Sequence, residues 1–60
     1  MTEAKVGATF RVNDNYPYRY PTPESNLTVT DVGVERVFAF TPNGEKWWFN
    51  LDEIDWWPKR

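Results

Sequence analysis

Few residues of this chain are of types that carry out chemistry. The sequence has no histidine and no cysteine, which removes the side chains that most often act as general bases and thiol nucleophiles. Ser25 has no base partner in the sequence. The acidic group Asp52, Glu53 and Asp55 offers paired carboxylates, but its spacing does not match a calcium-binding loop, and adjacent carboxylates near a surface turn are usually solvated. We therefore expect no catalytic site, no metal and no cofactor.

Aromatic side chains are abundant instead. The 60 residues include four tryptophans, four phenylalanines and three tyrosines. A chain of this size buries only about 60% of its unfolded surface, and it has no disulfide to compensate, so most of the rings are needed in the core. Only aromatic rings that the core does not need are available for binding. Each of the two Trp-Trp pairs, at 47–48 and 56–57, supplies one such ring, because neighbours on a strand point to opposite faces and one of the two must point away from the core.

The hydrophobic pattern predicts an all-β domain that spans residues 1–60. Apolar residues recur at every second position in several short runs rich in β-branched and aromatic residues. The predicted strands are residues 6–12, 27–32, 35–40, 45–51 and 55–57. Between the first two lies a long loop with three prolines and three tyrosines, residues 13–25, and a bend is expected at 31–33. Residues 51–54 have apolar side chains three positions apart, which predicts a single 3₁₀ turn before the last strand.

The Asn-Gly dipeptide at 43–44 predicts a hairpin with a two-residue loop. That loop would place Phe40 opposite Trp47 and Phe38 opposite Phe49. The face expected in the core then carries Phe38, Phe40, Trp47, Phe49 and Leu51. The face expected on the surface carries Val37, Ala39, Thr41, Lys46, Trp48 and Asn50.

The alternation of side chains along the last strand predicts which tryptophan of the second pair faces the core. If Ile54 is in the core, Trp56 points inward and Trp57 points outward. Trp48 and Trp57 are therefore the members of the two pairs that we expect to be exposed.

The order of these elements resembles that of Src-homology-3-like barrels, over about residues 6–57. The resemblance implies a small five-stranded barrel with a long first loop and a short 3₁₀ turn before the last strand. The stretches LTVTDVGVERVFAF and WWFNLDEIDW also resemble small orphan proteins of bacteriophages that infect actinobacteria. This second resemblance implies a phage origin and expression in the cytoplasm of a host bacterium.

Peptide-binding Src-homology-3 domains grip polyproline helices with tyrosines of the long loop, a tryptophan, and a proline and a tyrosine near the 3₁₀ turn. The resemblance implies that the tyrosines of the long loop supply the first part here. Residues 51–54, Leu-Asp-Glu-Ile, contain neither the proline nor the second tyrosine. Polyproline binding is therefore not the expectation for this chain.

Protein binding is the function that uses the residues present, because Trp, Tyr and Arg are enriched at interface hot spots. The expected binding residues are Tyr16, Tyr18, Arg19, Tyr20, Trp48 and Trp57. The expected partner is a host protein that is modulated by this binding, and a second copy of the chain is a further partner left open. The tyrosines have an alternative role, which is to fold back as a lid on the core.

Two other functions compete with host-protein binding. A small barrel can stack nucleic-acid bases on its aromatic rings, but the net charge of −2 and the scattered basic residues argue against it. A homo-oligomeric virion component is the other alternative. No apolar run is long enough to span a membrane, and the first residues lack a signal sequence, so we expect a cytoplasmic location without membrane association.

Overall fold

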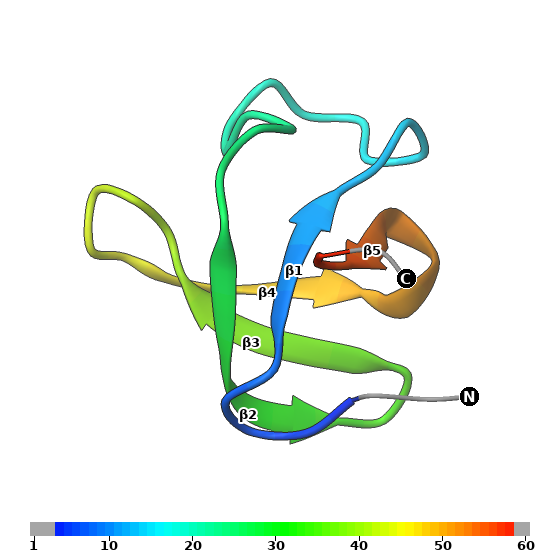
Figure 1. Ribbon diagram of the computed structural model, residues 1–60, viewed down its shortest axis with the longest axis vertical. Helices are drawn as coiled ribbons and strands as arrows, with labels where there is room; N and C mark the ends of the chain where they lie inside the picture. Colours follow the sequence, from blue (N-terminus) through cyan, green and yellow to red (C-terminus); the bar gives the residue numbers. More distant parts are fainter. Residues whose placement is uncertain (1–3, 59–60) are drawn as a thin grey trace.

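Five antiparallel strands form a single sheet in the computed structural model, which describes residues 4–58 (Figure 1). The strands are β1 (Thr9–Val12), β2 (Leu27–Gly33), β3 (Arg36–Phe40), β4 (Lys46–Asn50) and β5 (Ile54–Trp56), and a 3₁₀ helix, η1 (Leu51–Glu53), precedes β5. Their order in the sheet is β4-β3-β2-β1-β5. The predicted all-β class and the 3₁₀ turn are confirmed.

The sheet is open and bent around its central strand. The start of β2 pairs with β1, and the rest of β2 pairs with β3, with a register shift between Val29 and Asp31. Such a bulge increases the local twist of a strand. Within residues 4–58 no ladder joins β4 to β5, so these two strands are the edges of the sheet.

The first strand is shorter than the alternation of its sequence predicts. Val6 lies before β1 and is 66% exposed. Residues 5–8 form a turn, in which the Ala8 N–H donates to the Lys5 carbonyl oxygen at 3.1 Å and Gly7 has a φ of 94°. A positive φ of this size is readily available only to glycine. Gly7 therefore ends the regular alternation that suggested a longer strand.

The core lies on the concave side of the sheet and is contributed by every strand. Phe10 is fully buried at its centre, with its ring edge-on to Phe49 at 5.5 Å between centroids. The buried hydrophobic residues are Phe10, Val12, Leu27, Val29, Val37, Ala39, Phe49 and Ile54.

The turn between β3 and β4 differs from the prediction by one residue. The Gly44 N–H donates to the Thr41 carbonyl oxygen at 2.8 Å, and the Thr41 N–H donates to the Glu45 carbonyl oxygen at 2.7 Å. Residues 42–44 are therefore a three-residue loop, a type I turn followed by a residue with positive φ, and Gly44 has a φ of 91°.

Pro42 explains why the two-residue loop does not form. That loop would pair Pro42 with Glu45, although proline has no N–H to donate to the ladder. Proline is instead favoured at the second position of a type I turn, with glycine at the fourth. Asn43 would also need a positive φ in the two-residue loop, and it does not have one.

The corrected register reverses the two faces of β3. Phe38 pairs with Trp48 and Phe40 pairs with Lys46, because a slip of one residue sends every side chain of a strand to the opposite face. Phe40 is thus 54% exposed, and Phe38 is only half-buried. The predicted core positions of Phe38 and Phe40 are wrong, and so are the predicted surface positions of Val37, Ala39 and Thr41, which are buried.

The prediction for β4 holds better, because its faces were assigned correctly. Phe49 is buried, and Trp47 and Leu51 pack against the core. Trp48 is 51% exposed, as expected. Of the second pair, Trp56 is half-buried with its ring 6.1 Å from that of Phe10, whereas Trp57, which we expected to be exposed, is half-buried beneath Arg11.

Substitution of Phe49 and Phe40 tests this register. Phe49→Ala removes a ring that is 1% exposed and should lower the free energy of unfolding by about 3–5 kcal/mol. Phe40→Ala should lower it by less than about 1 kcal/mol. Urea denaturation followed by circular dichroism measures both values. Equal losses, or a larger loss for Phe40→Ala, would contradict the three-residue loop.

Candidate functional site

A groove of about 750 Å³ runs between β4 and the loop that connects β1 to β2. We call residues 13–26 the tyrosine loop and this hollow the aromatic groove. Figure 1 shows the loop, in cyan, projecting from the ends of β1 and β2. The lining residues are Tyr16, Pro17, Tyr18, Arg19, Tyr20, Lys46, Trp47, Trp48, Asn50 and Glu53.

Two asparagines fix the base of the tyrosine loop to η1. The side-chain amide of Asn13 donates to the backbone carbonyl oxygens of Asp52 and Ile54, at 3.1 and 3.3 Å. The Asn15 amide donates to the same Asp52 oxygen at 3.0 Å, and the Asn15 N–H donates to the Asn13 side-chain oxygen at 2.8 Å. Asparagine stabilises a tight turn in this way by bonding to the backbone two residues on. The loop therefore leaves β1 in a defined direction.

Tyr16 and Tyr20 hold the rest of the loop against β4. The Tyr16 ring lies 5.7 Å from that of Phe49, and its hydroxyl donates to the Tyr20 carbonyl oxygen at 2.8 Å. The Tyr20 ring meets Trp47 edge-on at 5.7 Å, and its hydroxyl accepts the Asn43 N–H at 2.9 Å. These two tyrosines thus act as a lid on the core and also form a wall of the groove.

Tyr18 differs from its two neighbours, because it is directed away from the core. Its ring is 70% exposed and contacts the Tyr16 ring edge-on at 5.4 Å. The loop therefore combines two tyrosines that anchor it with a third that is free to contact a partner.

Burial raises the pKa of the Tyr16 hydroxyl above its ordinary value, and the negative charge of Glu53 adds to the effect. Both causes favour the neutral phenol, because the phenolate would lose solvation and face a like charge. The neutral form is also the one that donates a hydrogen bond to the Tyr20 carbonyl oxygen.

The two basic residues of the groove differ in whether they already have an interaction partner. Lys46 forms an ion pair with Asp31, whose pKa is lowered mainly by the hydrogen bond from Lys46. Arg19 is exposed, and it makes no hydrogen bond, ion pair or ring contact with any residue of the described range 4–58. Arginine in this state is available to a carboxylate of a partner.

Trp48 forms the outer rim of the groove and is held by a cation. The Arg36 guanidinium lies 4.5 Å from the centroid of the Trp48 ring, and such contacts are attractive because the ring face carries negative charge. This contact favours the observed orientation of the indole.

The structure brings together five of the six predicted binding residues. Tyr16, Tyr18, Arg19, Tyr20 and Trp48 all line the aromatic groove. Trp57 lies elsewhere, stacked under the Arg11 guanidinium at 4.2 Å. The arginine is in turn held by the Asn26 side-chain oxygen, at 2.7 Å from its Nε.

Sequence reasoning missed five groove residues, which are Pro17, Lys46, Trp47, Asn50 and Glu53. Trp47 was assigned wholly to the core, but it is only half-buried and forms the floor beneath Tyr20. A signal for it was present, since the long tyrosine-rich loop had to cover some part of the sheet.

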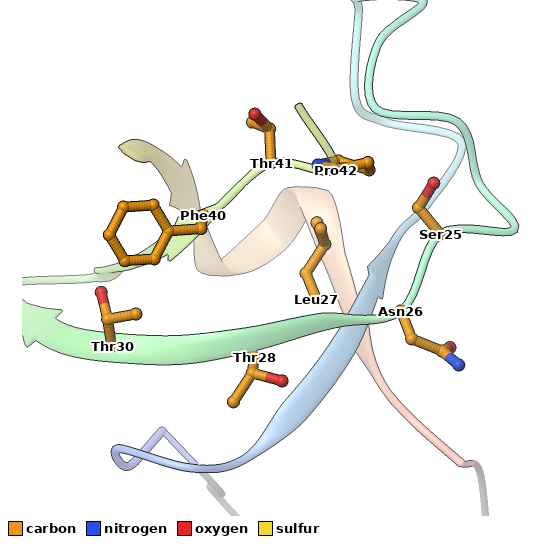
Figure 2. A pocket seen from close by; sticks show the side chains of 8 residues that line it. All are labelled: Ser25, Asn26, Leu27, Thr28, Thr30, Phe40, Thr41 and Pro42. Carbon is orange, nitrogen blue, oxygen red and sulfur yellow. The ribbon is translucent and has the colours of Figure 1, made fainter. Parts of the chain in front are cut away.

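A second hollow, of about 390 Å³, lies between the start of β2 and the end of β3 (Figure 2). Phe40 and Thr30 are on one side of it, and Ser25 and Asn26 are on the other. The Thr30 hydroxyl already donates to the Phe38 carbonyl oxygen at 3.2 Å, and the Thr41 hydroxyl accepts the Glu45 N–H, also at 3.2 Å. These hydroxyls serve the fold, so the aromatic groove is the stronger candidate site.

Metal-binding clusters and membrane-spanning helices are absent from the described residues 4–58. Within residues 4–58 no three acidic, histidine or cysteine side chains are placed to hold a metal ion. The same range contains no helix with the length and apolar character needed to cross a membrane. Comparisons of the chain with protein-family models, with curated proteins and with solved structures found no match.

The Tyr16 hydroxyl gives a test of the loop contacts. Because its pKa is raised in the folded state, its contribution to stability is present below the ordinary tyrosine pKa of about 10 and is lost as pH rises through the folded-state value. Tyr16→Phe should cost about 1 kcal/mol at neutral pH, because the Tyr20 carbonyl oxygen loses its donor. The variant should also lose less stability than the wild type at alkaline pH.

Urea denaturation at neutral pH and at about pH 10–11 measures both effects. Tyr18→Phe is the matched control, because the Tyr18 hydroxyl makes no hydrogen bond within residues 4–58, and at neutral pH it should leave stability unchanged. Identical pH dependence of the wild type and Tyr16→Phe would show that the loop is not held by this hydroxyl.

Proposed function

We propose that this protein is a small protein-binding module and that the aromatic groove is its binding site. The observation that carries the proposal is the convergence of Tyr18, Arg19 and Trp48 on one hollow. These are the residue types that dominate binding energy at interfaces. A concave, mostly apolar hollow with a few polar groups is also the usual form of a binding site.

The mixed construction of the groove supports binding to a protein in preference to a nucleic acid. Its charged residues are Arg19, Lys46 and Glu53, and Lys46 is already paired with Asp31. A phosphate backbone requires several unpaired cations along its path. One unpaired arginine among aromatic rings is better suited to a peptide.

We propose further that this open, bent sheet has the Src-homology-3-like barrel architecture without full closure. The strand order, the long loop after β1 and the position of η1 between β4 and β5 support this. η1 has the sequence Leu51, Asp52, Glu53, so the proline and tyrosine that such domains use near this turn are missing. The proposed partner segment is therefore not a polyproline helix.

The proposed partner is a protein of a bacterial host, which this chain would bind in the host cytoplasm and modulate. Support for the phage origin comes from the resemblance of residues 27–40 and 47–56 to small actinobacteriophage proteins. The aromatic groove supplies the surface by which such a protein acts on a host target without catalysis.

Partner capture by groove variants tests the proposal. The tagged chain is incubated with host lysate, and the captured protein is identified and its affinity measured with the purified pair. Tyr18→Ala and Trp48→Ser should each weaken binding by at least about 30-fold, which corresponds to the roughly 2 kcal/mol of a hot-spot residue.

Phe40→Ser is the matched control, since it removes an exposed aromatic ring that is not part of the groove. It should leave the affinity unchanged, and circular dichroism should report an intact fold for all three variants. Folded groove variants with full affinity would refute the proposal. Loss of binding in Phe40→Ser alone would move the site to the outer face of β3.

A further inference from the structure

The edge strand β4 has a free row of backbone hydrogen-bonding groups. The hydrogen bonds from Thr41 N–H to Glu45 and from Leu51 N–H to Glu35 mark the two ends of its ladder with β3. In an antiparallel pair the groups of alternate residues point toward the partner strand. Those of Trp47 and Phe49 therefore face β3.

The backbone groups of the three alternate residues face away from the sheet. These residues are Lys46, Trp48 and Asn50, and all three line the aromatic groove. No other strand in residues 4–58 pairs with this side of β4. The groove thus contains an unpaired strand edge along one wall and the tyrosine loop along the other.

The other edge of the sheet is less suited to accept a strand. β5 has three residues and is followed closely by Pro58, which has no N–H to donate. β4 has five residues without a proline or a bulge. A regular, unpaired edge of this kind can add another strand unless the protein protects it.

We propose that an extended segment of the partner protein adds to β4 as a sixth strand inside the aromatic groove, and that an acidic side chain of this segment binds Arg19. This inference rests on the proposed function, because it specifies how the same groove recognises its partner. The main-chain bonds to Lys46, Trp48 and Asn50 supply affinity, and alternate side chains supply specificity.

The tyrosine loop favours a single strand over a second copy of the chain. Tyr20 spans from Trp47 to the backbone of Asn43, so the loop stands along one face of the β4 edge. Antiparallel pairing of two β4 strands about a two-fold axis would place both loops on the same face of the joined sheet, next to the seam between the two copies. A single extended segment fits beside one loop.

Charge indicates the chemistry of that segment. Arg19 is the cation of the groove that has no partner within residues 4–58, and a carboxylate matches the two parallel donors of its guanidinium. Side chains on the same face as Trp47 and Tyr20 meet aromatic rings, so apolar residues suit those positions. The expected segment alternates apolar and polar residues and includes an Asp or Glu.

The test begins with a display library of random short peptides selected against the full chain. Synthetic copies of the selected peptides are then titrated into ¹⁵N-labelled protein. We expect peptides with alternating apolar residues and at least one carboxylate. Their binding should protect the amides of Lys46, Trp48 and Asn50 from hydrogen exchange, because these amides become bonded to the peptide.

Two sets of matched probes separate backbone from side-chain recognition. Peptides N-methylated at residues that bond β4 should bind about tenfold or more weakly than peptides methylated at the intervening residues. Lys46→Pro, which lacks the outward N–H, should bind more weakly than Lys46→Ala, which loses the same ion pair. Arg19→Gln should bind acidic peptides about tenfold more weakly and should not discriminate against their Glu-to-Gln versions.

Each remaining outcome overturns a defined part of the account. Selected peptides that bind through Tyr18 and Trp48 but tolerate methylation at every position would refute strand addition and leave the proposed function intact. Recovery of polyproline peptides would refute strand addition and the exclusion of a polyproline partner, and it would leave the groove as the binding site. If the β4 amides were protected from hydrogen exchange in a dimer without peptide, the β4 edge would be the binding surface for a second copy of the chain. If neither peptides nor a captured protein depend on the groove, the proposed function itself fails.

Discussion

The register between β3 and β4 determines which side chains of β3 face the core, and the turn at residues 41–45 determines that register. Pro42 and Gly44 fit a three-residue loop, which places Ala39 opposite Trp47 and Phe38 opposite Trp48. The small Ala39 then faces the core beside the larger rings. The same shift places Phe38 and Phe40 on the outer face together with Trp48, so the turn decides which aromatic rings of β3 contact solvent.

The aromatic groove links stability to binding because its walls are also part of the packing. Tyr16 touches the core ring Phe49, and Tyr20 touches Trp47, which forms the floor of the groove. A chain of 60 residues without disulfides has little surplus stability. It therefore uses the same rings twice, whereas Tyr18, Arg19 and Trp48 line the groove with no main part in the core. Loop residues held on a rigid scaffold in this way commonly carry function.

Much of the architecture could be predicted from the sequence, because alternation and turn residues are local signals. The strands after the tyrosine loop and η1 were placed within a few residues, and five of the six candidate residues meet in one groove. The face of β3 was predicted wrongly, since Val37 and Phe38 are equally apolar, only the turn length decides between them, and the preference of Pro42 for a type I turn was not weighed. The position of Trp57 beneath Arg11 depends on a contact across the sheet that no local pattern records.

The most direct test is the pattern of cross-strand contacts between α-protons in a nuclear Overhauser spectrum of the labelled protein. Such contacts are strong between the directly opposed, non-hydrogen-bonded residues of an antiparallel pair. The three-residue loop predicts a strong contact between Phe38 and Trp48, which would place Trp47 toward the groove and Phe40 toward solvent. A strong contact of Ala39 with Trp48 in place of that of Phe38 with Trp48 would restore the two-residue loop, in which 39 and 48 are the non-hydrogen-bonded pair, and would contradict the account of the core.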